Sequence, residues 1–133
     1  MNKQLELVKE FQKLFGHPVS SVPTTLTSKQ ARLRFELMKE ENEEFLEACD
    51  NYDKIEMLDA LGDMMYILCG TILECGMQDK IVEAVEEIHK SNLSKLDEEG
   101  NAIFREDGKV LKSDSYIAPN LEKVLYGSTK KED

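Results

Sequence analysis

The sequence predicts an all-α protein: a four- to five-helix bundle with a short extended or hairpin segment near its carboxyl end. Apolar residues recur at helical spacing over most of the chain up to Lys95. Aromatic residues are few, Trp is absent, and Leu, Met, Ile and Val supply most of the apolar volume. A chain of 133 residues is long enough for one domain with its own core. We expect a single domain over residues 1–127 and a polar tail over residues 128–133.

The first two helices are expected in the amino-terminal half. Apolar residues at helical spacing predict a helix over residues 2–15, with Gly16 as its stop. The next segment contains two prolines and several serines and threonines, which predicts a loop. Thr27 or Ser28 is then expected to cap a second helix that runs to about Ala48.

Two further helices and a small hairpin complete the expected fold. A third helix is expected over residues 54–74, where Gly70 indicates a kink or a close helix contact. Asp79 is expected to cap a fourth helix that reaches Ser91 or beyond. Beyond it, turn signals around two short apolar pieces predict a hairpin, and a last helical turn is expected at residues 120–126.

Charge and cysteine content exclude several classes of function. A formal net charge of -10 argues against nonspecific nucleic-acid binding and against an anionic membrane surface. The three cysteines, Cys49, Cys69 and Cys75, lack metal-finger spacing and are expected to be reduced core thiols. No signal peptide or membrane span is recognisable, so a cytoplasmic location is expected.

The second helix carries a row of acids on its apolar side. A helix turns by about 100° per residue, so Glu40, Glu41 and Glu44 fall within roughly the same 100° arc as Leu37 and Ala48. Because Glu-rich helices are common on protein surfaces, a solvated face with ordinary ion pairs remains an alternative for this helix alone.

The third helix carries a second row in a more apolar setting. Glu56, Asp59 and Asp63 lie within about 60° of one another by the same rotation. A helix that is apolar on nearly all sides is expected to be buried, which leaves these acids little access to solvent. The apolar residues around them are Ile55, Met57, Leu58, Leu61, Met64, Met65, Ile67 and Leu68.

Together the two rows predict a divalent-metal site. Burying a carboxylate without a partner is unfavourable, and neighbouring carboxylates repel one another. The sequence offers too few basic residues nearby to neutralise both rows. Mg²⁺, or Mn²⁺ in its place, prefers carboxylate oxygens and would neutralise them.

Basic and amide side chains farther along the chain are weaker candidates. Asn92 and Lys95 share a helix face. Lys95 could contact a phosphate, and Asn92 could contact the coordination shell of a metal or a base. The alternative is an ordinary polar helix end, where Lys and Asn are favoured. Lys109 and Lys112 could bring two more ammonium groups to a polyphosphate. Arg32 and Arg34 precede the acids, and one of them could pair with Glu36 or hold substrate, but an exposed ion pair is expected. No phosphate-binding glycine loop or serine nucleophile motif is present, so any chemistry must come from metal and carboxylates.

These motifs resemble those of the all-α NTP pyrophosphohydrolases, which include MazG-like enzymes and phosphoribosyl-ATP pyrophosphohydrolase. Residues 40–44 resemble the EExxE element. Residues 56–59 match the ExxD element literally, whereas residues 63–66, an acid followed by apolar residues, fit its usual continuation. Glu56 with Asp59 and Asp59 with Asp63 therefore both remain open as the second acid pair. The segments Ser91–Lys95 and Gly108–Lys112 resemble the phosphoribosyl-ATP pyrophosphohydrolase-like branch, and the likeness runs from about Phe11 to Leu125.

The resemblance implies a helical homodimer or dimer of dimers and Mg²⁺-dependent cleavage of a nucleoside triphosphate between its α and β phosphates. It implies Glu40 as the residue that orients or deprotonates the attacking water. Its implied metal ligands are Glu41, Glu44, Asp59 and Asp63, with Glu56 as a substitute, and its implied substrate contacts are Asn92, Lys95, Lys109 and Lys112. Hydrolysis of phosphoribosyl-ATP and nucleotide binding without catalysis are the alternatives.

Overall fold

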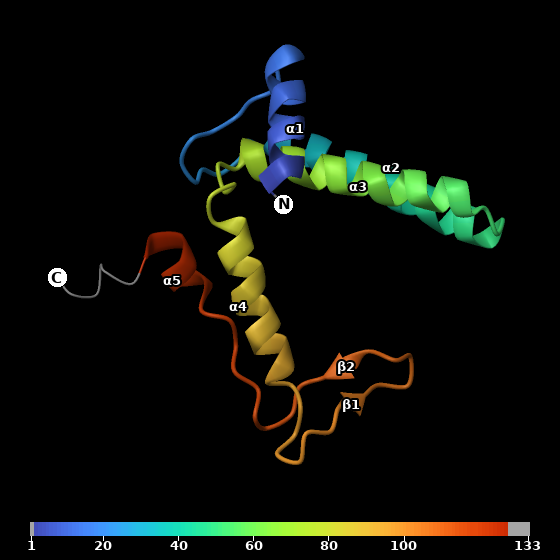
Figure 1. Ribbon diagram of the computed structural model, residues 1–133, viewed down its shortest axis with the longest axis vertical. Coiled ribbons are helices and arrows are strands. Elements are labelled where there is room, and N and C mark those ends of the chain that lie inside the picture. Colours follow the sequence, from blue (N-terminus) through green and yellow to red (C-terminus); the bar gives the residue numbers. More distant parts are fainter. Residues whose placement is uncertain (1, 128–133) are drawn as a thin grey trace. The chain divides into compact units, whose positions relative to one another are not determined.

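The computed structural model describes residues 2–127 and is mostly helical, as expected (Figure 1). Its five helices and one two-stranded hairpin follow the predicted order. In chain order they are α1 (Asn2–Leu14), α2 (Ser28–Asp50), α3 (Lys54–Glu74), α4 (Ile81–Leu93), β1 (Ile103–Phe104), β2 (Val110–Leu111) and α5 (Leu121–Tyr126). The expected polar tail at 128–133 lies outside the described residues.

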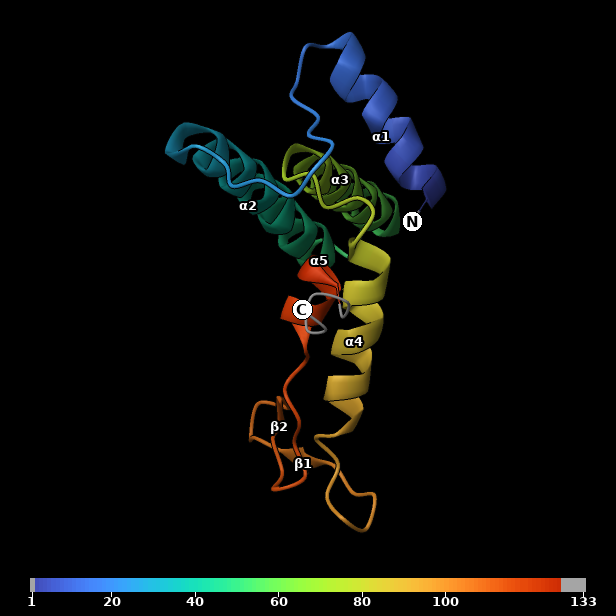
Figure 2. The same cartoon turned by 90° about the vertical axis from the view of Figure 1, so that its left-hand side faces the viewer.

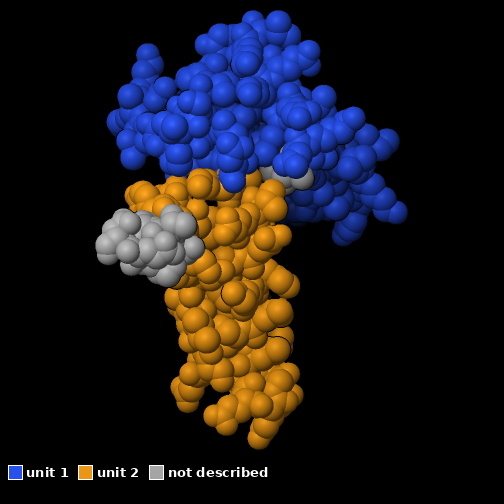
Figure 3. Space-filling model, turned by 60° about the vertical axis from the view of Figure 1, so that its left-hand side comes forward, with its two compact units in different colours: residues 1–79 blue, residues 80–133 orange. Residues whose placement is uncertain are grey.

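The chain divides into two compact units, coloured separately in Figure 3. The amino unit, residues 1–79, contains α1, α2 and α3. The carboxyl unit, residues 80–133, contains α4, the hairpin and α5. No helix in the part of the chain that the structure describes combines the length and apolar character needed to cross a membrane.

In the amino unit, α2 and α3 form an antiparallel helical hairpin, and α1 lies against α3 (Figure 2). A capping box starts α2, because the Gln30 backbone N–H donates to Thr27 Oγ1 at 3.1 Å and Gln30 Oε1 accepts from the Thr27 N–H at 2.9 Å. Of the two expected caps, Thr27 and Ser28, the structure uses Thr27. Asp53 caps α3 by accepting from the Glu56 N–H at 3.1 Å.

The start of α4 corrects one prediction. Asp79 was expected to cap this helix, but the N-cap position is Lys80, which makes no side-chain cap bond. The Lys80 backbone is already close to helical, with φ −114° and ψ −19°. An N-cap side chain reaches the first free N–H groups of a helix when its own backbone is extended. Because Lys80 begins α4 from a nearly helical backbone, no side chain caps these N–H groups.

The surface of α3 also differs from the expectation of a wholly buried helix. Its last turns are enclosed, with Cys69 and Leu73 buried. Near its start, however, Ile55 is 79% exposed and Leu58 is 73% exposed in the single chain. Exposed apolar surface continues along the helix at Leu61, Met65 and Leu68. The chain alone thus leaves an apolar side of α3 uncovered.

The carboxyl unit contains the expected hairpin, in which Ile103 pairs with Leu111 and Phe104 with Val110. Gly108 turns the chain between these strands with φ 93°, a backbone conformation that side chains disfavour. The three cysteines are free thiols, as predicted, although only Cys69 is fully buried.

Candidate metal centre

The α2–α3 hairpin brings acids from both predicted rows together around Glu41. Burial first, and then the charges of Asp63, Glu44 and Asp59, together raise the pKa of the Glu41 carboxyl from its ordinary 4.5 to about 7. Glu41 Oε1 is buried and accepts no hydrogen bond from the described residues. Among the described residues, the face between the two helices therefore holds one oxygen of the Glu41 carboxyl, Oε1, that no donor reaches.

A hydrogen bond between the Glu41 and Asp63 carboxyls adds to the raised pKa of Glu41. Two carboxyls can share such a bond only while one of them carries a proton, since two carboxylates have no hydrogen to donate. When both lose their protons, a cation between them is the remaining way to offset their charge. The oxygen-rich donor set fits a hard divalent ion such as Mg²⁺ or Mn²⁺.

The other predicted acids lie in more open surroundings. Asp63 is half-buried like Glu41, whereas Glu40, Glu44, Glu56 and Asp59 are exposed in the single chain. Glu56 lies in the first turn of α3 and is not among the groups that act on Glu41. Within residues 2–127, no three Asp, Glu, His or Cys side chains converge closely enough to form a ready-made metal site.

The expectation of an exposed ion pair for Arg34 is wrong. Arg34 is buried against α3, where Nη1 lies 3.1 Å from Glu74 Oε2. Gln12 of α1 is buried beside them and donates to the same Glu74 oxygen at 3.1 Å. A signal existed in the sequence, because Gln12, Arg34 and Glu74 each lie at helical spacing from apolar residues of their own helix, but the pattern does not tell which polar residues meet.

In the carboxyl unit, the serines of the Ser91–Lys95 segment have structural contacts. Ser91 Oγ donates to the Ile117 carbonyl at 2.7 Å, and Ser94 Oγ accepts from the Ile117 N–H at 2.8 Å. These bonds tie the chain before α5 to the end of α4. Asn92 is exposed and Lys95 half-buried beside them.

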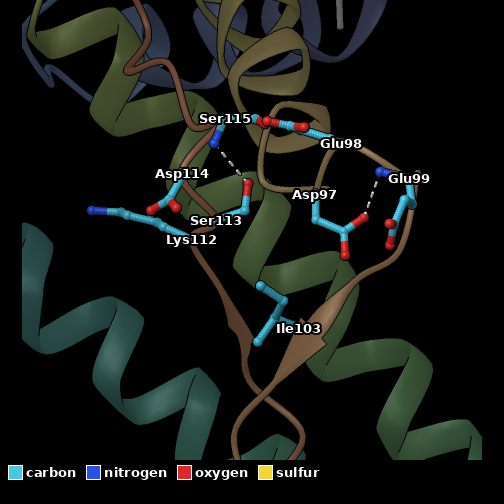
Figure 4. A pocket seen from close by; sticks show the side chains of 8 residues that line it. All are labelled: Asp97, Glu98, Glu99, Ile103, Lys112, Ser113, Asp114 and Ser115. Atoms are coloured by element: carbon cyan, nitrogen blue, oxygen red, sulfur yellow. Dashed lines mark hydrogen bonds between the residues drawn. The ribbon is translucent and has the colours of Figure 1, made fainter.

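The two predicted lysines of the hairpin region, Lys109 and Lys112, take no part in the hydrogen bonds to Ile117. Lys109 is exposed in the turn. Lys112 Nζ lies 4.7 Å from the ring centre of Tyr116, a cation–π arrangement. Lys112 also lines a hollow of about 370 Å³ whose other lining residues are Asp97, Glu98, Glu99, Ile103, Ser113, Asp114 and Ser115 (Figure 4). With four carboxylates around it, this hollow repels a polyphosphate in the conformation described.

Comparison with known proteins places these features in a family. The family model of phosphoribosyl-ATP pyrophosphohydrolase matches residues 8–92, more than half of the chain. An uncharacterized protein of Acanthamoeba polyphaga mimivirus is 35% identical over 74 aligned residues, and the match covers 49% of this chain and 28% of that relative. The family match contains both acid rows and ends at Asn92, before the three predicted lysines.

Proposed function

Because the chain belongs to the phosphoribosyl-ATP pyrophosphohydrolase family, we propose that it hydrolyses a nucleoside triphosphate between the α and β phosphates, giving the monophosphate and pyrophosphate. The observation that carries the proposal is the Glu41 oxygen that has no partner among the described residues, in a half-buried position beside Asp63. A carboxylate in this position needs a proton or a cation, and Mg²⁺-dependent phosphoanhydride hydrolysis uses such a cation.

The proposed ligands are Glu41, Glu44, Asp59 and Asp63, and Glu56 is the substitute. Asp59 and Asp63 are favoured over Glu56 because their charges act on Glu41 and that of Glu56 does not. A bound Mg²⁺ would neutralise phosphoryl charge and lower the pKa of water. Glu40 adjoins Glu41 in sequence and is exposed, so it is free to accept a proton from an attacking water.

Substrate contacts are proposed for the carboxyl unit. Asn92 and Lys95 would meet the base or the phosphates, and Lys109 and Lys112 would add positive charge, Lys112 after leaving Tyr116. Phosphoribosyl-ATP is the second candidate substrate, since the matching family carries its name. Nucleotide binding without hydrolysis is favoured by one observation, the lack of a ready-made metal cluster among residues 2–127.

We further propose that the chain forms a homodimer, or a dimer of such dimers. The uncovered apolar side of α3, residues Ile55, Leu58, Leu61, Met65 and Leu68, would lie in the contact between copies. Large exposed apolar surfaces of this kind mark interaction sites. Light scattering after size exclusion, with Leu58→Glu as the disrupting variant, tests this assembly.

The test of function is pyrophosphate release from a panel of standard and modified dNTPs and phosphoribosyl-ATP, with Mg²⁺ or with EDTA. Glu41→Gln should abolish release without unfolding the protein. Glu43→Gln is the matched control, because Glu43 is an exposed glutamate of the same helix outside the acid row. Wild-type protein that binds nucleotide saturably and releases no pyrophosphate would identify it as a binding protein instead.

A further inference from the structure

We propose that Arg34, Glu74 and Gln12 form a positioning cluster that fixes the register of α2 against α3 and so aligns the carboxylates around Glu41. The role of those carboxylates rests on the function proposed above. The cluster itself is defined by hydrogen bonds and one ion pair within the amino unit, and none of its members belongs to the proposed metal ligands.

Arg34 reaches three acceptors on successive turns of α3. Its Nη2 donates to the Ile67 carbonyl at 2.8 Å, its Nε to Thr71 Oγ1 at 2.9 Å and its Nη1 to Glu74 Oε2 at 3.1 Å. The guanidinium is planar and presents its N–H groups in a fixed fork. Three bonds along one helix therefore fix the position of Arg34 along the axis of α3.

The opposite charges of Arg34 and Glu74 cancel, and the whole cluster is closed to solvent. Arg34 is 7% exposed, Glu74 4% and Gln12 2%. Gln12 Nε2 donates both to Glu74 Oε2 and to the Pro18 carbonyl, each at 3.1 Å, which joins α1 and the following loop to the pair. Because an unpaired buried charge is strongly disfavoured, a slipped arrangement that separates Arg34 from Glu74 is unfavourable.

Gly70 shows how closely the guanidinium passes over α3. A Cβ built at Gly70 would lie 2.6 Å from Arg34 Nη2 and 3.2 Å from Gln12 Oε1. Any side chain there would displace the guanidinium from the Ile67 carbonyl. The close helix contact predicted at this glycine is thus a contact with a charged side chain.

The cluster and the acids lie on the same faces of the two helices. Glu41 follows Arg34 by seven residues, about two helical turns, and Ile67 follows Asp63 by four, about one turn. A slip of one residue would move a carboxylate by about 1.5 Å and rotate it by about 100°. Metal–ligand distances tolerate deviations of about 0.2 Å, so the register decides whether the carboxylates can share an ion.

The acids cannot set this register themselves. Glu41, Asp59 and Asp63 repel one another when ionised, which drives α2 and α3 apart at that point. Among the described residues, the ion pair that joins α2 to α3 is the one between Arg34 and Glu74. The cluster thus supplies an attractive contact between the two helices that does not depend on a bound ion.

The experiment compares Arg34→Lys with Leu73→Ala in the full-length protein. Lysine keeps the charge but cannot reach three acceptors, whereas Leu73 is buried in the same helix and its side chain forms none of the cluster's hydrogen bonds. Mn²⁺ affinity by titration and kcat and KM with a dNTP are measured where both variants are folded. We expect Arg34→Lys to weaken Mn²⁺ binding at least tenfold and Leu73→Ala to change it less than twofold.

A second readout keeps the test independent of the proposed function. In metal-free protein, NOEs between methyl groups of α2 and α3 report their register, and we expect their pattern to change in Arg34→Lys alone. Unchanged NOEs and wild-type Mn²⁺ affinity in folded Arg34→Lys would overturn the positioning role, as would equal effects in Leu73→Ala. If wild-type protein binds no Mn²⁺, the proposed metal chemistry fails, and the NOE pattern alone decides the role of Arg34.

Discussion

Replacing Glu41 by Gln should stabilise the metal-free protein at alkaline pH. The folded state holds the Glu41 proton more tightly than the unfolded chain does, because the pKa of the carboxyl rises from 4.5 to about 7 on folding. Stability is therefore lost as the pH rises from about 4.5 through 7, since the unfolded chain ionises first. Glutamine remains neutral and removes this loss.

The magnitude follows from the same change in pKa. At about 1.4 kcal/mol per pKa unit, the rise from 4.5 to about 7 corresponds to about 3 kcal/mol once Glu41 is fully ionised. Glu41 is partly exposed, and solvent screening reduces this figure. We expect Glu41→Gln to exceed the wild type by about 1–2 kcal/mol in free energy of unfolding at pH 8 and to match it below pH 4.5.

Urea unfolding in EDTA between pH 4 and pH 8 provides the measurement. The difference between wild type and variant isolates Glu41 from the other titrating groups. Glu43→Gln, which makes the same change in charge on the exposed side of α2, should leave the pH dependence unaltered. If Glu41→Gln were less stable than wild type at pH 8, or kept the wild-type pH dependence, Glu41 would not be an unpartnered half-buried acid.

Three further predictions follow. Mg²⁺ at about 100 times its Kd should stabilise the wild type by about 2.7 kcal/mol in thermal unfolding, and EDTA should reverse the effect. Glu41→Gln should lose this stabilisation. Equal stabilisation of wild type and Glu41→Gln would exclude Glu41 as a ligand. Gly70→Ala should destabilise the protein by about 1–3 kcal/mol, because its Cβ would lie 2.6 Å from the Arg34 guanidinium. Gly62→Ala, whose Cβ would meet nothing within 4 Å, should instead stabilise it by up to about 1 kcal/mol. Denaturant unfolding measures both variants, and equal shifts would contradict the close contact at Gly70. Ser91→Ala should cost about 1 kcal/mol in the carboxyl unit through loss of its 2.7 Å bond to the Ile117 carbonyl, and hydrogen exchange that stays as slow as wild type around Ile117 would rule this out.

Much of the fold was predictable because its signals are local. Helical spacing of apolar residues located the helices, and the turn residues around Gly108 located the hairpin. Thr27 could be named as one of two caps, since capping depends on residues within one turn. The Asp79 prediction failed because the cap depends on the backbone angles of Lys80, which residue type does not specify.

The candidate site was predictable as two rows and not as a set of contacts. Rotation along each helix shows which acids share a face, but the neighbours of Glu41 depend on the register of α2 against α3. The burial of Arg34 was missed for the same reason, since its partner Glu74 is forty residues away in sequence. The exposure of Ile55 and Leu58 shows a further limit, because an apolar helix surface does not tell whether its own chain covers it.

That uncovered end of α3 also bears on how long a solitary molecule survives. Ile55 and Leu58 lie beside the turn at residues 51–53, where the Tyr52 side chain, 91% exposed, adds an aromatic ring to the same exposed apolar surface. Proteases recognise such segments, and the proposed assembly of copies would cover this one, so proteolysis of the purified chain should slow as its concentration rises.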